Sequence, residues 1–429
     1  MPYTENTPLL GLNGSAIPRS FGARVVSRIK AEGEPTWGAS IHEFLFSSWL
    51  NILLLFIPLS TTAHFNDWDA GLQFSLSFLA IMPLAKLLGD ATEQVSLELD
   101  QTLGDLLIAS FGNAVEVIVG LAALLQGELR IVQTSMLGSI LSNIILDLGM
   151  AFFVGGIYRI ENEFHITAAK NSVSIMTLSC ITLVIPAAYH ATQLEPHRHK
   201  YYHMPGYFSE GAGVAPQTDP VGLDGLLTIS RGTSILLLLI YAAFLFFQLK
   251  THTVLFDNAT PAYLEETVEA QGPEDEVKMN MASAGLALLT VTVITSFCAS
   301  WLVASIEETA KKYSIPRAFI GLILLPIVAN AAKHVTSVWM AANDNMELAI
   351  AIAIGSSIQI STFVVPLLVL VGWFANRPLT LFFADFETII FFMSIILVNL
   401  LVQDGRSNYL EGLILVVLYI VIALTFWVS

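Results

Sequence analysis

Hydrophobic residues gather along this chain in long runs that are separated by short polar segments. Each run is long enough to cross the hydrocarbon core of a bilayer as a helix of about 20 residues. We place eleven such runs, near residues 42–60, 70–90, 103–125, 131–156, 171–191, 232–249, 281–304, 316–341, 346–372, 380–402 and 409–428. The pattern predicts an all-α polytopic membrane protein with eleven transmembrane helices.

Small and polar residues inside these runs occur twice in the same order. Residues 103–150 and 321–359 each carry an Asn in mid-helix and a Gly-Ser pair in the following helix. One offset of 217 positions pairs Asn113 with Asn330 and Ser139 with Ser356. The chain is therefore predicted to be an internal duplication, and matched polar, glycine-interrupted helices are typical of secondary transporters.

The offset also predicts how the repeats are arranged. It superimposes helices 3 and 4 on helices 8 and 9, so each repeat has five helices, 2–6 and 7–11, and the N-terminal helix is an addition. Because five is odd, the second repeat enters the membrane from the opposite face, which makes the repeats inverted. The expected units are an N-terminal disordered tail, the first helix with its loop, the first repeat, an acidic linker and the second repeat, at residues 1–41, 42–69, 70–250, 251–280 and 281–429.

Composition agrees with this picture and excludes several functions. The 429 residues are 55% hydrophobic and 13% charged, whereas a soluble domain carries about 25% charged residues. The net charge of −16 comes from tails and loops, and without a basic patch nucleic acid is not an expected partner. No phosphate loop, nucleophile elbow or zinc signature is present, so we expect neither an enzyme nor a resident cofactor.

Charged residues outside the apolar runs suggest the orientation of the chain. Arg19, Arg24, Arg28 and Lys30 precede the first run and favour a cytosolic N-terminus. The linker at 251–280 is then cytosolic. Its acids indicate either a solvated connector or a cation-attracting regulatory segment. Four histidines follow the fifth run and fit an exposed loop better than a metal or pH sensor, at positions His190, His197, His199 and His203.

A carboxylate within an apolar helix is the strongest sign of chemistry. An ionised Glu at mid-membrane costs about 2 to 4 kcal/mol, so Glu116 needs a ligand or a partner. Helical spacing places Asn113 on its face, and Asn330 is the counterpart in the second repeat. The other candidate ion- or proton-binding residues are Ser139, Asn143, Asp147, Lys333, His334, Ser356 and Gln359. Carboxylate, amide and hydroxyl oxygens suit hard cations such as calcium, although the serines alone fit simple helix-to-helix bonding.

These motifs resemble the two signature regions of the CAX calcium/proton exchangers, in the calcium/cation antiporter superfamily. The resemblance lies in GNAVE and GSILSN, in the second-half NAA–H and GSSIQI, and in the C-terminal LTLFFADFETIIFF and LVQDGRSNYLEG, which are similar to fungal and plant vacuolar members. It implies two repeats of the sodium/calcium exchanger type. It also implies a multi-pass protein of the vacuolar membrane that exchanges cytosolic calcium for vacuolar protons. Glu116, Asn113 and Asn330 would then be the calcium ligands.

The second signature departs from the family pattern. The family reads Gly-Asn-Ala-Ala-Glu-His where this chain reads residues 329–334, so Lys333 replaces the second glutamate, and Asp147 replaces an expected aliphatic residue. Because a buried ammonium needs an anion, we predict that Lys333 pairs with Glu116 in preference to Asp147. Calcium exchange with help from Asp147, monovalent cation/proton exchange and a non-transporting regulatory paralogue all stay open. The expected partners are a cation, protons and the bilayer, and the sequence leaves a homo-oligomer open.

Overall fold

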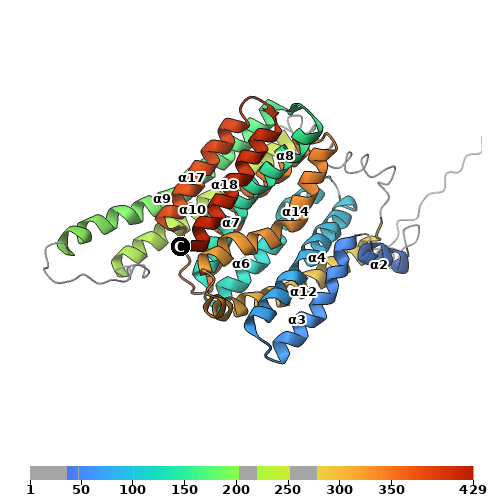
Figure 1. Cartoon of the computed structure of the whole chain (residues 1–429), viewed down its shortest axis with the longest axis horizontal. Coiled ribbons are helices and arrows are strands. Elements are labelled where there is room, and N and C mark those ends of the chain that lie inside the picture. Colours follow the sequence, from blue (N-terminus) through green and yellow to red (C-terminus); the bar gives the residue numbers. More distant parts are fainter. Residues whose placement is uncertain (1–35, 47, 100, 202–219, 252–277, 429) are drawn as a thin grey trace, which may run out of the picture.

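The computed structural model describes residues 36–46, 48–99, 101–201, 220–251 and 278–428 (Figure 1). Most of the predicted tail and acidic linker therefore lies outside the described residues. The described chain of the first half comprises α2 (Trp37–Phe46), η1 (Trp49–Leu55), α3 (Phe56–Phe65), α4 (Ala70–Leu97), α5 (Gln101–Phe111), α6 (Ala114–Gln126), α7 (Leu129–Leu141), η2 (Ser142–Asp147), α8 (Leu148–Tyr158), β1 (Asn162–Glu163), α9 (Ile166–Tyr201), α10 (Pro220–Phe246) and η3 (Phe247–Thr251).

The second half continues the helical pattern. It comprises α12 (Met281–Tyr313), α13 (Arg317–Phe319), η5 (Ile320–Leu324), α14 (Leu325–Ala342), α15 (Met346–Gln359), η6 (Ile360–Val364), α16 (Val365–Phe374), α17 (Asp385–Leu401), β2 (Arg406–Ser407) and α18 (Tyr409–Val428). The two short strands pair antiparallel and join the loops after α8 and α17. The all-α prediction is confirmed.

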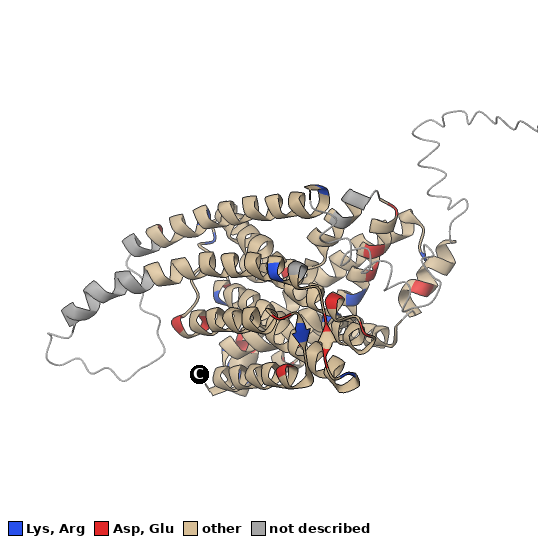
Figure 2. Ribbon diagram, turned by 90° about the horizontal axis from the view of Figure 1, so that it is seen from above, with Lys and Arg blue, Asp and Glu red and all other residues tan. Residues whose placement is uncertain are grey.

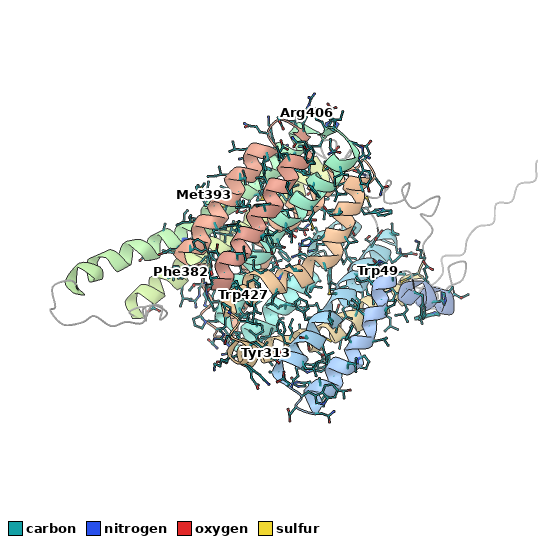
Figure 3. All side chains as sticks on the ribbon, viewed as in Figure 1. Trp49, Tyr313, Phe382, Met393, Arg406 and Trp427 are labelled. Carbon is teal, nitrogen blue, oxygen red and sulfur yellow. The ribbon has the colours of Figure 1, made fainter. Side chains whose placement is uncertain are left out.

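The number of spans differs from the predicted eleven. Within the described residues, nine helices are long and apolar enough to cross a membrane, or ten if the bent pair α2 and η1–α3 is one span. The helix α17 has 17 residues, somewhat short of the about 20 that a span needs. Charged residues are sparse along the ribbons of the described chain (Figure 2). Large apolar side chains such as Met393 and Trp427 are about half exposed on the outer helices, as contact with lipid requires (Figure 3).

The first predicted helix, 42–60, was wrong as a single straight element. The chain bends by 92° between α2 and the η1–α3 segment. Asn51 donates from Nδ2 to the carbonyl oxygens of Phe44 and Leu45, at 3.3 and 3.0 Å, and so caps the end of α2. Ser48 accepts a hydrogen bond from the backbone N–H of Leu50 at 3.3 Å and starts the next helix. Polar caps inside an apolar run therefore divide it.

The predicted loop after the fifth run was also placed too early. The helix α9 continues to Tyr201, so the positions of His190, His197 and His199 are helical, and His203 lies outside the described residues.

The first helices of the two repeats lie side by side. The 28-residue α4 packs along the 33-residue α12, and with α3 they form one group in Figure 1. The backbone N–H groups of Lys278 and Met279 donate to Gln94 near the end of α4, at 3.1 and 3.2 Å. At the opposite end, Asp69 before α4 accepts a hydrogen bond from the Tyr313 hydroxyl at 2.9 Å. The two helices are thus antiparallel, as inverted repeats require.

Backbone features recur at the predicted offset of 217 residues. The turn between α6 and α7 contains Gly127 at φ 84°, and the turn between α14 and α15 contains Asp344 at φ 73°. Adding 217 to the residue numbers of the π-helical segment η2 gives 359–364, which overlaps η6 at 360–364. Because π turns and non-glycine residues with positive φ, such as Asp344, are uncommon, their recurrence at this offset supports the duplication.

One signature glycine has a packing role. A Cβ added to Gly138 on α7 would lie 2.2 Å from the backbone oxygen of Leu322 in η5. The glycine is therefore required for the close contact of α7 with the second repeat. Nothing lies within 4 Å of a Cβ built on its counterpart, Gly355.

A candidate ion-binding site

The site begins where the third predicted helix breaks. The helix α5 ends at Phe111 and α6 starts at Ala114, with Asn113 at φ −116° and ψ 30° between them. Glu116 consequently lies in the first turn of α6, where the positive end of the helix dipole favours a carboxylate. The sequence placed Glu116 in the middle of one continuous helix, so the break adds a stabilising field that was not predicted.

Lys333 on α14 meets three oxygen atoms at this break. Its Nζ donates to Glu116 Oε1 at 2.6 Å, to Asn113 Oδ1 at 2.7 Å and to Asn330 Oδ1 at 3.1 Å. The Glu116 side chain is 1% exposed and that of Lys333 is 20% exposed. The predicted pairing of Lys333 with Glu116 is confirmed, and the paired residues are separated by the repeat offset of 217.

Both amides are held so that their oxygens face the ammonium. Asn113 Nδ2 donates to Gln359 Oε1 at 2.5 Å, and Asn330 Nδ2 donates to the carbonyl oxygen of Pro326 at 3.1 Å. Since each NH2 group has its own acceptor, the amide oxygen is left to point at Lys333. One carboxylate and two amide oxygens thus converge on a single positive charge.

This arrangement surrounds an ammonium with three oxygen atoms. Carboxylate and amide oxygens are the donors that hard cations prefer, and the Lys333 ammonium lies where a small cation would bind them. Among the described residues, no group of three or more His, Cys, Asp and Glu side chains is placed to hold a metal ion. The site can therefore offer a cation one carboxylate, and that carboxylate is already neutralised by the tethered ammonium.

A cavity of about 1140 Å³ reaches the site from one side of the protein. Glu116, Lys333 and Gln359 line its inner part. Its walls continue to Asp90 near the end of α4 and to Lys278 before α12, where the described chain resumes after residue 251. Ser356, another predicted residue, also lines it. The cavity therefore opens on the face that the linker joins.

Polar contacts join the helix ends on the opposite face. Arg317 pairs with Glu128 after α6, at 3.2 Å, and lies 3.8 Å from Glu307 on α12. Asp69 pairs with Lys312, and hydrogen bonds from Lys312 and Tyr313 lower the pKa of its carboxyl. The cavity thus opens toward one side, and ion pairs join the helix ends on the other.

Four predicted site residues do not bind the ammonium. Ser139, Asn143, Asp147 and His334 are all buried, and none of them hydrogen-bonds to Lys333 within the described chain. Sequence analysis did not select Asp90, which lines the cavity and pairs with Lys86 at 2.5 Å. The i, i+4 spacing of these two opposite charges in an apolar run was the available signal.

The fold defines a secondary transporter built from inverted repeats around a central polar cluster. The sodium/calcium exchanger protein family matches residues 70–250 and 283–428, and the chain belongs to this family. The chain is 43% identical to a vacuolar calcium ion transporter of Schizosaccharomyces pombe over 99% of its length and 93% of that protein. It is 38% identical to vacuolar cation/proton exchanger 3 of Oryza sativa subsp. japonica, covering 91% of this chain and 88% of the relative.

Solved structures agree with the family assignment. The structure of native YfkE is similar with a TM-score of 0.70 and 28% sequence identity, covering 89% of this chain and all of that one. A crystal structure of the H+/Ca2+ exchanger CAX is similar with a TM-score of 0.64 over 91% of this chain and 89% of that one. At 12% identity the second comparison concerns the fold alone. The family resemblance seen in the sequence is confirmed.

Proposed function

We propose that the protein is an antiporter of the vacuolar membrane that moves cytosolic calcium into the vacuole in exchange for protons. The observation that carries this function is the cluster of Glu116, Asn113 and Asn330 oxygens around a positive charge at the end of a one-sided cavity. The relatives named as vacuolar calcium transporters and cation/proton exchangers support the ion and the membrane. With a cytosolic linker, the cavity is open to the cytosol and ready to load calcium.

In this proposal Glu116 is the residue that binds the transported cation. Its carboxylate exchanges the Lys333 ammonium for the cation, and the amide oxygens of Asn113 and Asn330 complete the inner ligands. Gln359 holds Asn113 and lines the cavity, so it is the next oxygen available to an entering ion. The cation and the Lys333 ammonium compete for this carboxylate, so cation entry is coupled to the charge state of the groups around Lys333.

Calcium cannot enter this site while the Lys333 ammonium is in it. Two unit charges 4 Å apart repel by about 4 kcal/mol at an effective dielectric constant of 20, and a divalent ion doubles that to about 8 kcal/mol. The ammonium therefore leaves the three oxygens before or as calcium binds. This displacement is the step that sets this chain apart from an exchanger with two glutamates.

Monovalent cation/proton exchange is the second candidate. The site already holds a monovalent cation, the ammonium of Lys333, at distances of 2.6–3.1 Å from three oxygens. A sodium or potassium ion would replace it with no change in net charge. A non-transporting paralogue is the third possibility, and a flux measurement separates it from both.

The function is tested by ion uptake into proteoliposomes that contain the purified protein and are acidic inside. Calcium, manganese, sodium and potassium are compared, and we expect calcium uptake that requires the pH gradient. Glu116→Gln is expected to reduce uptake to background, because it removes the carboxylate. Glu163→Gln, at an exposed position on β1, is the matched control and should transport normally. Normal uptake by the Glu116 variant would remove that residue from the mechanism, and binding without flux would indicate the non-transporting alternative.

A further inference from the structure

A second polar cluster is buried next to the ion site. Asp147 and Ser337 are 0% exposed, Asn143 is 1% exposed and His334 is 6% exposed. Both Asp147 carboxylate oxygens, Asn143 Nδ2, Ser337 Oγ and His334 Nε2 make no hydrogen bond within the described part of the chain. Buried polar groups are rarely left in this state, and here four residues from two elements share it.

The cluster is formed by the packing of two elements. Asn143 and Asp147 belong to the π-helical segment η2, and His334 and Ser337 belong to α14, against which η2 packs. The Ser337 hydroxyl is near enough to the Asp147 carboxyl to interact with it, although without the geometry of a hydrogen bond. Residues three and four apart are neighbours on a helix, so Ser337 lies one turn beyond Lys333 on the same face. The cluster therefore adjoins the site of Lys333.

Lys333 is the charged neighbour of Asp147. The segment η2 packs against α7, α8, α14, α15, α17 and α18. At the depth of Asp147, α14 presents Lys333 and His334, and α18 presents the buried Tyr419, whose hydroxyl also has no partner in the described chain. The other acids and bases of these helices lie near their ends. One ammonium thus interacts with two buried carboxylates: it hydrogen-bonds to Glu116 and acts on Asp147 at longer range.

One ammonium cannot neutralise both carboxylates. In this structure it bonds to Glu116, so an ionised Asp147 would be buried without a hydrogen bond, at an expense of several kcal/mol. A proton on Asp147 removes this difficulty and turns the carboxyl into a donor. The cavity lining does not include the cluster, so a proton fits it and a hydrated metal ion does not.

We propose that Asp147 carries the exchanged proton and is the second docking position of the Lys333 ammonium. This rests on the proposed function. When calcium binds Glu116, Asn113 and Asn330, the still protonated Lys333 moves to Asp147, which releases its proton. Before calcium binds, Glu116 carries a charge of −1, Lys333 a charge of +1 and Asp147 no charge. After calcium binds, Glu116 and Lys333 keep their charges and Asp147 carries −1. One proton therefore leaves for each calcium ion that binds.

The test counts protons released on calcium binding by the purified full-length protein in weakly buffered detergent, read with a pH indicator dye. Wild type is expected to release about one proton per calcium bound. Asp147→Asn has no proton to release and no anion to receive the ammonium, so we expect release to fall near zero and calcium affinity to drop at least about tenfold, or 1.4 kcal/mol. Asp67→Asn is the matched control, because Asp67 has φ 49° and asparagine tolerates that conformation.

A second variant separates this switch from a structural role of Asp147. In Lys333→Met the ammonium is gone, so Asp147→Asn added to it should leave calcium affinity within about twofold of the single Lys333 variant. Such dependence of one substitution on the other is the signature of coupled residues. Thermal unfolding of each variant shows that it is folded.

The outcomes distinguish the two hypotheses. If Asp147→Asn released as many protons as wild type and bound calcium with the same affinity, the switch would be overturned, whereas the proposed calcium exchange would not. An equal loss of affinity in both backgrounds would also overturn it, because Asp147 would then act independently of Lys333. Absence of calcium binding by wild type would overturn the proposed function together with this inference.

Discussion

Replacement of Lys333 by methionine tests the idea that a tethered ammonium occupies the cation site. Methionine keeps a long unbranched side chain and removes the charge. Glu116, 1% exposed, then loses its closest positive partner at 2.6 Å. Removing one member of a buried ion pair destabilises a protein by about 3–5 kcal/mol, and because Lys333 is 20% exposed we expect the lower end, about 3 kcal/mol.

Calcium should reverse this loss. In wild type the ion must displace the ammonium, whereas in Lys333→Met it meets an unpaired carboxylate. The same 3 kcal/mol or so therefore appears as a gain of about hundredfold in calcium affinity, at 1.4 kcal/mol for each factor of ten. Because a ligand stabilises the state that binds it, the variant should gain more thermal stability from calcium than wild type does.

The assay is thermal unfolding of the detergent-purified protein, followed by tryptophan fluorescence with and without calcium. Lys311→Met is the matched control, since that side chain is 76% exposed and pairs with its neighbour Glu307 in the same helix. We expect Lys333→Met to unfold at a lower temperature without calcium and to recover with it, while Lys311→Met behaves as wild type. An equal calcium-induced shift in wild type and Lys333→Met would show that the ammonium does not compete for the site.

Two further predictions concern packing and pH. Gly138→Ala should destabilise the protein by about 1–3 kcal/mol, because the new methyl would overlap the Leu322 carbonyl. Gly355→Ala, at the matching position of the other repeat, meets nothing within 4 Å and should be neutral, and equal unfolding temperatures for the two variants would contradict the packing argument. The pKa of Asp69 is lowered in the folded protein by hydrogen bonds from Lys312 and Tyr313. Its contribution to stability is therefore complete above the unfolded-state value of about 3.9 and is lost only as pH falls through the lower folded-state value. Acidification from pH 7 to 5 should thus leave the α4–α12 contact closed, as hydrogen exchange at the start of α4 would report, and opening in that range would refute the assignment.

Local physical chemistry determined much of this protein from its sequence. A helix can cross a membrane when about 20 consecutive residues are mostly apolar. The helices were therefore recognisable from local composition, without knowledge of which helices pack beside them. The cost of a buried charge is equally local, which is why Glu116 and Lys333 were identified as a site and as a pair. The duplication was visible because both repeats keep polar residues at a fixed spacing, from Asn113 and Asn330 onward.

Features that depend on contacts between distant segments required the tertiary structure. The orientation of the Asn113 amide depends on Gln359, which is 246 residues away in the chain. The direction of the cavity depends on how α4 and α12 lie against the other helices, and hydropathy carries no such information. The separation of Asp147 from Glu116 follows from the packing of η2 against α14. Sequence spacing places residues on one face of one helix, but the relative position of two faces is fixed only when their side chains pack.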